Sequence, residues 1–475
     1  MQYMNELAYM VSAMAGVSTQ TFRIEPNNTT DALAGRKVSF ALPSSALLNM
    51  RTLAFHFSAS ANETASAGGR LPPKIASLVD RIELQAGGQM IQQGFNGQNS
   101  YIHLRDSICE KNSADHVLGH PYVVRSNSYV DGFGSAGTAA ILTTGNESYP
   151  VTSGAAQFCV NNFVGFPGTC EPAVQNMSIL PDCVLNIYLA GNEVLSSSNG
   201  VALSLTGVND ITDAGTATAA FKLSNMHLTI EAIGLASSVY DQVIASEIAA
   251  NGFVAVNFKN YYSFSDTHSG STKFSVATQS LDRLWVGTRA TGYDTTQLLS
   301  SVKGYKVAGA FTSATSNALP LQDVGRPLYD IGGVLNTNQE MYLPAYFNFS
   351  EVACRSSANV APTLQLQLNG SYIPAYKATV EEMWQVSKNS APMYHYGKEM
   401  LMSLDQYRNN FYGFAIRLCL PSDDVRVASG LDTRSIALQG YINTTGLVST
   451  TNMLVFAETT ATLRIGSARQ CNVVV

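Results

Sequence analysis

The fold is decided by stretches such as Ile82-Glu83-Leu84-Gln85-Ala86-Gly87-Gly88, in which apolar and polar residues alternate before a pair of glycines. Alternation with period two is typical of a strand with one buried face, and paired glycines favour a tight turn. The second half of the chain repeats this pattern in Leu364-Gln365-Leu366-Gln367-Leu368-Asn369-Gly370. A strand that ends in a tight turn is therefore expected in both halves.

Short alternating runs recur through most of the chain and are separated by Gly, Asn, Asp, Ser and Pro. This pattern predicts an all-β protein. Further strands are expected at residues 38–42, 53–57, 184–189, 226–230, 254–258, 414–418 and 453–456. Alternation also assigns the faces of each strand. The residues expected to point into the first core are Phe55, Phe57, Ile82, Leu84, Ile187, Leu189, Leu228 and Ile230, and those expected in the second are Val254, Val256, Phe258, Leu366, Ile416, Leu418 and Leu463.

A second internal similarity relates residues 78–84 to residues 280–286, about 200 positions later. Both similarities suggest a β-rich unit that occurs twice. The two similarities imply different alignments of the first half of the sequence with the second half. Which residues of the two units correspond therefore stays open.

Helical patterns are few. Residues 238–251 form one candidate helix near the middle of the chain, with Ser238 as its N-cap and Gly252 directly after its end. The first 15 residues place apolar side chains at three- and four-residue steps, which predicts an amphipathic helix. This N-terminal stripe consists of Met1, Met4, Leu7, Met10, Val11 and Met14. Either it packs on its own domain, or it docks on a neighbouring subunit or a membrane.

Charged residues make up 13% of the 475 residues, against about 25% in an ordinary soluble protein. The net charge of −6 argues against a surface that neutralises phosphate throughout, so nucleic acid is not the default partner. Seven cysteines without a CxxC pair argue against a disulfide framework or a thiolate zinc site and favour a reducing compartment. The pattern of the first residues predicts no signal peptide. No run reaches about 18 apolar residues, so no transmembrane helix is expected.

Motifs that carry chemistry are weak. Residues 132–137 match GxGxxG, but they lie in a loop-like stretch without the strand and helix of a nucleotide site. Asp115, His116 and His120 could ligate a metal, yet Pro121 disfavours a helix there, so a polar loop is preferred. No catalytic residues, metal site or cofactor site are therefore expected.

The aromatic cluster of Tyr261, Tyr262 and Phe264 follows an alternating strand, and Lys259 is the one cation nearby for a phosphate. We therefore expect packing in a core or interface in preference to stacking on bases or sugars, because aromatic side chains bury large areas.

Several segments occur along nearly the whole chain in a characteristic order. They are residues 79–91 with the turn Gly87-Gly88-Gln89, residues 98–106, Ser280-Leu281-Asp282-Arg283-Leu284-Trp285, Leu368-Asn369-Gly370-Ser371-Tyr372-Ile373-Pro374, Ser429-Gly430-Leu431-Asp432-Thr433-Arg434 and residues 457–465. In this order they resemble the double jelly-roll major capsid proteins of double-stranded DNA viruses. The similarity is closest to those of virophages and polinton-like viruses, and giant-virus capsid proteins are more distant.

The resemblance implies an all-β architecture of two consecutive eight-stranded jelly-roll sandwiches, with a short inter-domain helix and an N-terminal amphipathic helix. The expected domains are an N-terminal amphipathic arm at residues 1–18, a first jelly roll at 19–236, a linker helix at 237–252 and a second jelly roll at 253–475. Three loops, at residues 122–156, 191–219 and 290–335, are expected at the outer end of the sandwiches.

For function, the resemblance implies a structural subunit of an icosahedral virus shell that is not an enzyme and resides in the virion capsid after assembly inside the host cell. Its main partner would be itself, first as a homotrimer that forms a pseudo-hexagonal capsomer and then between capsomers. Penton and minor capsid proteins are further expected partners, direct sequence-specific nucleic acid binding is not expected, and an internal membrane is left open. The N-terminal stripe would then dock at the capsid interior.

The alternative is a carbohydrate-binding or adhesin-like β-sandwich protein. That function would need a secretion route or metal-binding carboxylates in loops, and the sequence offers neither. An enzyme ranks third, since a glycosidase needs two carboxylates in one cleft and no motif indicates them.

Overall fold

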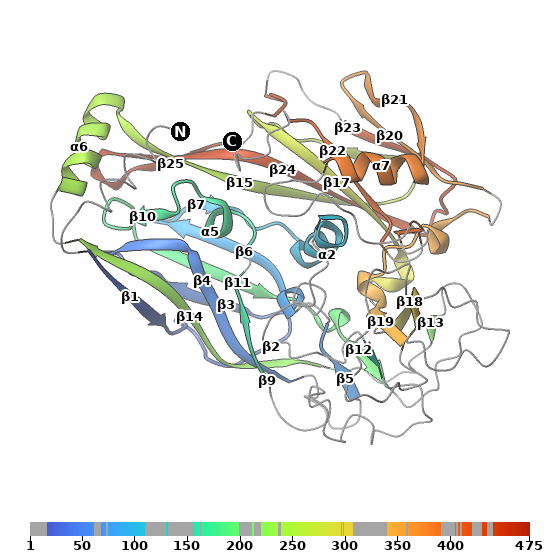
Figure 1. Ribbon diagram of the computed structural model, residues 1–475, viewed down its shortest axis with the longest axis horizontal. Coiled ribbons are helices and arrows are strands. Elements are labelled where there is room, and N and C mark those ends of the chain that lie inside the picture. Colours follow the sequence, from blue (N-terminus) through green and yellow to red (C-terminus); the bar gives the residue numbers. More distant parts are fainter. Residues whose placement is uncertain are drawn as a thin grey trace.

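The computed structural model of this chain describes residues 17–60, 68–72, 75–109, 130–131, 156–161, 163–198, 211–212, 220–235, 239–295, 297, 299–306, 340–357, 360–390, 404, 407–408, 411–419, 430–434 and 440–475. Strands dominate these residues and form two β-sandwiches that lie side by side (Figure 1). The predicted all-β fold is confirmed.

The first sandwich is built from two antiparallel sheets. One sheet has the order β1 (Val17–Ile24), β14 (Lys222–Leu235), β4 (Leu47–Ser60) and β10 (Val174–Asn176). The other has the order β3 (Lys37–Ala41), β11 (Cys183–Leu189), β6 (Val79–Ala86) and β7 (Gln89–Gln92). Two short strands extend the first sheet, namely β2 (Ala32–Leu33) beside β14 and β9 (Ala156–Val160) beside β4.

The second sandwich repeats this plan. One sheet has the order β15 (Phe253–Thr267), β24 (Thr451–Gly466), β17 (Leu281–Ala290) and β22 (Gly413–Arg417), with β25 (Cys471–Val474) beside β24. The other has the order β16 (Ser271–Phe274), β23 (Gly440–Thr445), β20 (Thr363–Leu368) and β21 (Ser371–Thr379).

Both sandwiches have the same topology. When the main-path strands of each half are numbered in chain order, the two sheets read 1-8-3-6 and 2-7-4-5 in both halves. This strand order is that of the jelly roll. Consecutive strands alternate between the two sheets, except that the fourth and fifth strands form a hairpin within one sheet. The chain is therefore a double jelly roll, as the resemblance implied.

The topology decides between the two internal similarities. Residues 79–84 lie in the fourth strand of the first half, whereas residues 281–286 lie in the third strand of the second. The similarity between residues 78–84 and 280–286 is therefore not the structural repeat. The other internal similarity, between residues 82–88 and 364–370, relates β6 to β20. Each of these is the fourth main-path strand of its half. The turns that follow them also match, because Gly87 and Gly88 have φ of 55° and 86° while Asn369 and Gly370 have φ of 45° and 85°. Two consecutive positive φ values are typical of the type I′ hairpin turn.

Within the described residues, three longer helices accompany the sheets, namely α2 (Gln98–Cys109), α6 (Val239–Asn251) and α7 (Val380–Ser390). The helix α6 joins the last strand of the first jelly roll to the first strand of the second. It ends where predicted, since Gly252 has φ of 80° and its N–H donates to the carbonyl of Ile248 over 2.8 Å. The helices α2 and α7 both follow the fifth main-path strand of their half.

The remaining described elements are short. The helical turns are η1 (Ile75–Leu78), α5 (Phe166–Thr169), η3 (Asn192–Val194), η4 (Thr291–Tyr293), η6 (Ala345–Phe347), η7 (Val352–Cys354) and η8 (Ser467–Arg469). The strands β5 (Gly68–Arg70) and β12 (Ser196–Ser198) pair with each other. A separate sheet has the order β13 (Ile211–Thr212), β18 (Leu299–Lys306), β19 (Glu340–Pro344) and β8 (Val130–Asp131).

All eight residues predicted for the first core are buried there. The prediction for the second core needs correction. Leu366 and Ile416 lie in it and Leu418 packs against its edge, but Val256, Phe258 and Leu463 are buried in the cluster of the first jelly roll. Val254 is only partly buried. The reason is strand length, because β15 and β24 are 15 and 16 residues long and continue beyond their own sandwich to cover the first one.

The helix α2 lies between the two sandwiches (Figure 1). Its residues Tyr101, Ile102 and Leu104 belong to a third apolar cluster. Tyr261 stacks on Phe95 with ring centroids 5.4 Å apart and lies 5.0 Å from the ring of Tyr101. Tyr262 and Phe264 are partly buried against the second core. The expected packing role of this aromatic cluster is therefore confirmed.

Candidate assembly surfaces

The N-terminal stripe of Met1, Met4, Leu7, Met10, Val11 and Met14 lies outside the described residues, as do the GxGxxG stretch and the Asp115, His116 and His120 group. The described chain starts with Val17, which pairs with Leu235 just before α6. The stripe is therefore attached at the end of the molecule that carries α6.

The two ends of the molecule are well separated. The strand β24 begins with Thr451, which pairs with Ala290 near the loops, and ends with Gly466, which pairs with Phe253 beside α6. At about 3.3 Å per residue, its 16 residues span roughly 50 Å. The fold thus presents a loop end and an α6 end on opposite sides of both sandwiches (Figure 1).

The loop end gathers described parts of all three predicted loops. The strands β8, β13 and β18 come from the segments at residues 122–156, 191–219 and 290–335, and they join with β19 in one sheet. Two loops of the first jelly roll and one of the second therefore meet at the same end. The rest of these segments lies largely outside the described residues.

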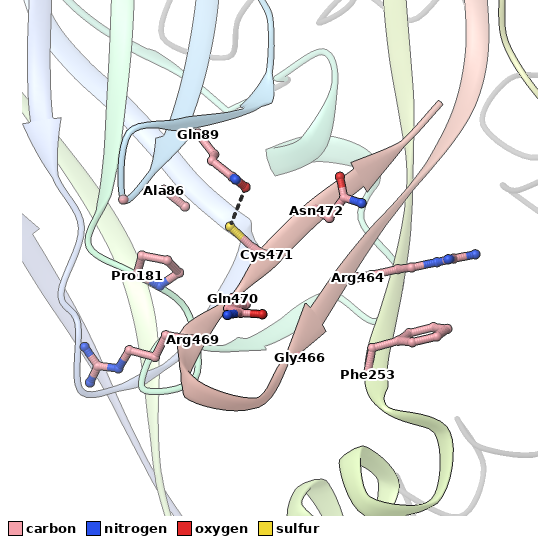
Figure 2. A pocket seen from close by; sticks show the side chains of 11 residues that line it. Ala86, Gln89, Pro181, Phe253, Arg464, Gly466, Arg469, Gln470, Cys471 and Asn472 are labelled. Atoms are coloured by element: carbon pink, nitrogen blue, oxygen red, sulfur yellow. Dashed lines mark hydrogen bonds between the residues drawn. The ribbon is translucent and has the colours of Figure 1, made fainter.

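The α6 end contains a pocket of about 490 Å³ where the two halves of the chain meet (Figure 2). The turn after β6 contributes one wall, and the β24–β25 hairpin contributes the other. Arg464 and Arg469 line it together with the amides of Gln89, Gln470 and Asn472, and the lining contains no acidic residue. Guanidinium and amide groups are donors, so this pocket suits an anionic group such as a carboxylate.

Large apolar side chains are exposed at equivalent sheet edges. The fifth strand of each jelly roll, β7 in the first and β21 in the second, is an edge strand of its sheet. Met90 on β7 is 37% exposed, while Tyr372 and Tyr376 on β21 are 49% and 52% exposed. Edge strands with exposed apolar residues are suited to contacts with another chain.

The second jelly roll also buries a charged cluster that sequence reasoning did not find. The guanidinium of Arg283 donates to Oε1 of Glu458 over 2.9 Å, and the indole of Trp285 donates to Oε2 over 3.1 Å. Burial alone would raise the pKa of Glu458, but Arg283, Lys259 and Trp285 together hold it below its usual range. The sequence did contain a signal for this cluster. Charged residues are few in this chain, yet Lys259, Arg283 and Glu458 each lie within a segment that otherwise has the composition of a buried strand.

In the described part of the chain, six cysteines are free and buried, and no group of side chains could hold a metal ion. Among the same residues, no helix is long and apolar enough to cross a membrane.

Two jelly rolls of identical strand order in one chain define the double jelly-roll class of proteins. The structure is similar to the PBCV-1 virus capsid in a quasi-atomic model, with a TM-score of 0.55 and 13% identity over 97% of both chains. The crystal structure of PBCV-1 VP54 fitted into a reconstruction of the virophage Sputnik gives a TM-score of 0.56 with the same identity and coverage. The Faustovirus major capsid protein gives 0.54 with 9% identity over 95% of this chain and 91% of that chain. Neither a protein-family model nor a curated protein matches this sequence.

Proposed function

We propose that this chain is a structural subunit of an icosahedral virus shell and that it assembles as a homotrimer. The observation that carries the proposal is the pair of jelly rolls with one strand order, a fold that the chain shares over nearly its full length with viral capsid proteins. No catalytic step belongs to this role.

The geometry suits tiling. Two similar sandwiches side by side give a protomer with two similar lateral units, so three protomers place six such units in a ring. A ring of six similar units approximates a hexagon, which can cover a surface without gaps. Homotrimers would form capsomers, and further contacts would join each capsomer to its neighbours, to penton proteins and to minor capsid proteins.

The chemistry of the surface supports contacts between copies. Charged residues are 13% of the chain, and interfaces between subunits are depleted in charge at their centres. The exposed tyrosines Tyr372 and Tyr376 on β21 lie on an edge strand of the second jelly roll, where they can contact a neighbouring copy.

The separation of the loop end from the α6 end supports a proposal for orientation. We assign the loop end to the outer face and the α6 end to the interior, so that the N-terminal stripe docks inside on a neighbouring subunit, a minor protein or a membrane. The pocket beside α6 would then face the interior as well.

The test is the mass of the purified protein in solution. Light scattering at micromolar concentration should give three times the chain mass, and electron microscopy of the same sample should show particles with threefold symmetry and a hexagonal outline. Obligate interfaces of this kind bury roughly 2,000 Å² or more, so dilution to the nanomolar range should leave the trimer intact. A monomer at micromolar concentration would overturn the proposal, and a monomer that binds sugars would favour the carbohydrate-binding alternative.

A further inference from the structure

The buried charged cluster of the second jelly roll brings an amine and a carboxyl group into direct contact. Lys259 on β15, Asp282 on β17 and Glu458 on β24 are 1%, 0% and 3% exposed. The Nζ atom of Lys259 lies 2.6 Å from Oδ2 of Asp282 and 3.7 Å from Oε1 of Glu458. A nucleophile, an electrophile and a second carboxylate therefore share one site closed to solvent.

The backbone conformation at Asp282 directs its carboxyl group toward this site. The pairing of β17 with β24 shifts register between Leu281 and Arg283, so Asp282 is the extra residue of a β-bulge. A bulge turns a side chain away from its regular direction. Here the carboxyl group reaches Lys259 although β24 lies between their two strands.

We propose that Lys259 and Asp282 join in an autocatalytic isopeptide bond, with Glu458 as the group that moves the proton. A proton first passes from the Lys259 ammonium to Oδ2 of Asp282, which is 2.6 Å away, and this leaves a neutral amine and a neutral acid. The Nζ atom then attacks Cγ of Asp282, a bond forms between them, and the bond from Cγ to Oδ2 breaks. An ammonium and a carboxylate become one amide and one water molecule, so the reaction balances without an oxidant, a reductant or any other reactant.

Hydroxyl groups hold the Asp282 carboxyl in position for this step. The Ser280 hydroxyl donates to Oδ1 over 2.7 Å, and the Thr460 hydroxyl donates to Oδ2 over 2.6 Å. Oδ1 would become the amide oxygen and stay on its donor, while Oδ2 would leave as water beside Thr460. Donors placed where negative charge develops stabilise the tetrahedral intermediate of acyl transfer.

The two carboxyl groups are suited to different tasks. Burial raises the pKa of Asp282, against the opposing effect of Lys259, which favours the neutral acid that an amine can attack. Glu458 has a lowered pKa, so it is present as the carboxylate that can take a proton from Nζ and return it to the leaving oxygen. Carboxyl groups whose environments separate their pKa values are typical of acid and base partners.

Burial also favours the product. A buried ion pair costs several kcal/mol of desolvation per ion, and a neutral amide removes both charges. Proximity adds to this, because reacting groups held in contact gain effective molarities of roughly 10⁵ M or more. The product would be a covalent link between β15 and β17 across β24.

Intact-mass spectrometry of the full-length protein, purified folded and then denatured, tests the inference directly. The native protein, incubated at neutral pH until its mass is constant, should weigh one water molecule less than its sequence requires. Tandem mass spectrometry of a digest should locate a branched peptide that joins Lys259 to Asp282.

Two variants complete the test. Lys259→Arg keeps the positive charge but cannot form the amide, so it should show the full sequence mass. Lys273→Arg changes an exposed lysine on β16 and should keep the loss of one water. A wild-type protein at its full sequence mass would overturn the proposal, and so would a water loss located elsewhere in the chain. Neither result depends on whether the protein forms a shell.

Discussion

At the scale of single residues, two imidazole rings meet on the sheet of β4 and β14. His56 stacks on His227 with ring centroids 5.0 Å apart, and its Nε2 atom lies 2.9 Å from Oγ1 of Thr229. Burial, then His227, then Arg23 lower the pKa of His56. The folded protein therefore keeps this ring neutral at pH values where a free imidazole carries a proton.

This shift predicts that stability falls as the pH is lowered from about 7 to about 5. The unfolded chain takes up a proton on His56 near its ordinary pKa of about 6.5, whereas the folded chain takes it up only at lower pH. Because the unfolded state binds more protons in this window, acid favours unfolding. Denaturant titrations at several pH values should show a weaker pH dependence in His56→Gln than in the wild type.

His268 provides the internal control for that comparison. Burial lowers its pKa as well, and it is present in both proteins, so its contribution cancels in the difference. Equal pH dependence in the two proteins would contradict the assigned role of His56.

At the scale of elements, the two equivalent hairpin turns can be tested against each other. Gly88 after β6 and Gly370 after β20 have φ of 86° and 85°, and no atom lies within 4 Å of a Cβ added at either position. Substitution by Ala should therefore act through backbone strain alone. The left-handed conformation costs a residue with a Cβ about 1–2 kcal/mol.

We expect Gly88→Ala and Gly370→Ala each to lower the free energy of unfolding by about 1–2 kcal/mol, since they occupy the same position of the same turn. Gly292→Ala is the matched control, because this glycine also has open space around its Cβ position but lacks a positive φ. Chemical denaturation measures all three. If the control loses as much stability as the two turn variants, the strain argument fails.

Element prediction from sequence succeeded where the signal is local. The end of α6 at Asn251 and the turn after β6 depend on residues adjacent in the chain, and both lie where expected. The internal repeat could not be assigned in this way, because residues 280–286 resemble residues 78–84 without occupying the equivalent strand. Similar strands share composition, and only sheet order shows which of them correspond.

At the scale of the whole molecule, we predict that the N-terminal stripe is needed for assembly of the shell but not for folding of the trimer. No described strand includes residues 1–15, so their removal should leave the melting temperature of the trimer unchanged. It should also lower the yield of closed shells, because an apolar stripe attached at the α6 end would lose its docking partner. Calorimetry of the trimer beside an assembly assay measures both effects.

A full-length variant serves as the matched control for the truncation. Met4→Ser, Leu7→Ser and Met10→Ser together keep the chain length and remove the stripe, so this variant should reproduce the loss of closed shells. If the truncated trimer instead melts earlier and assembles normally, the stripe belongs to the core of its own domain.

The sequence by itself determined which residues are buried in strands, because period-two alternation is a local property that each strand carries alone. Tertiary structure decided which core they join: Phe258 and Leu463 were expected in the second core, and the length of β15 and β24 carries them into the first. The same holds for the charged cluster. Lys259 and Asp282 are 23 positions apart and Arg283 and Glu458 are 175 apart, and these pairs meet because one sheet places β15, β24 and β17 side by side.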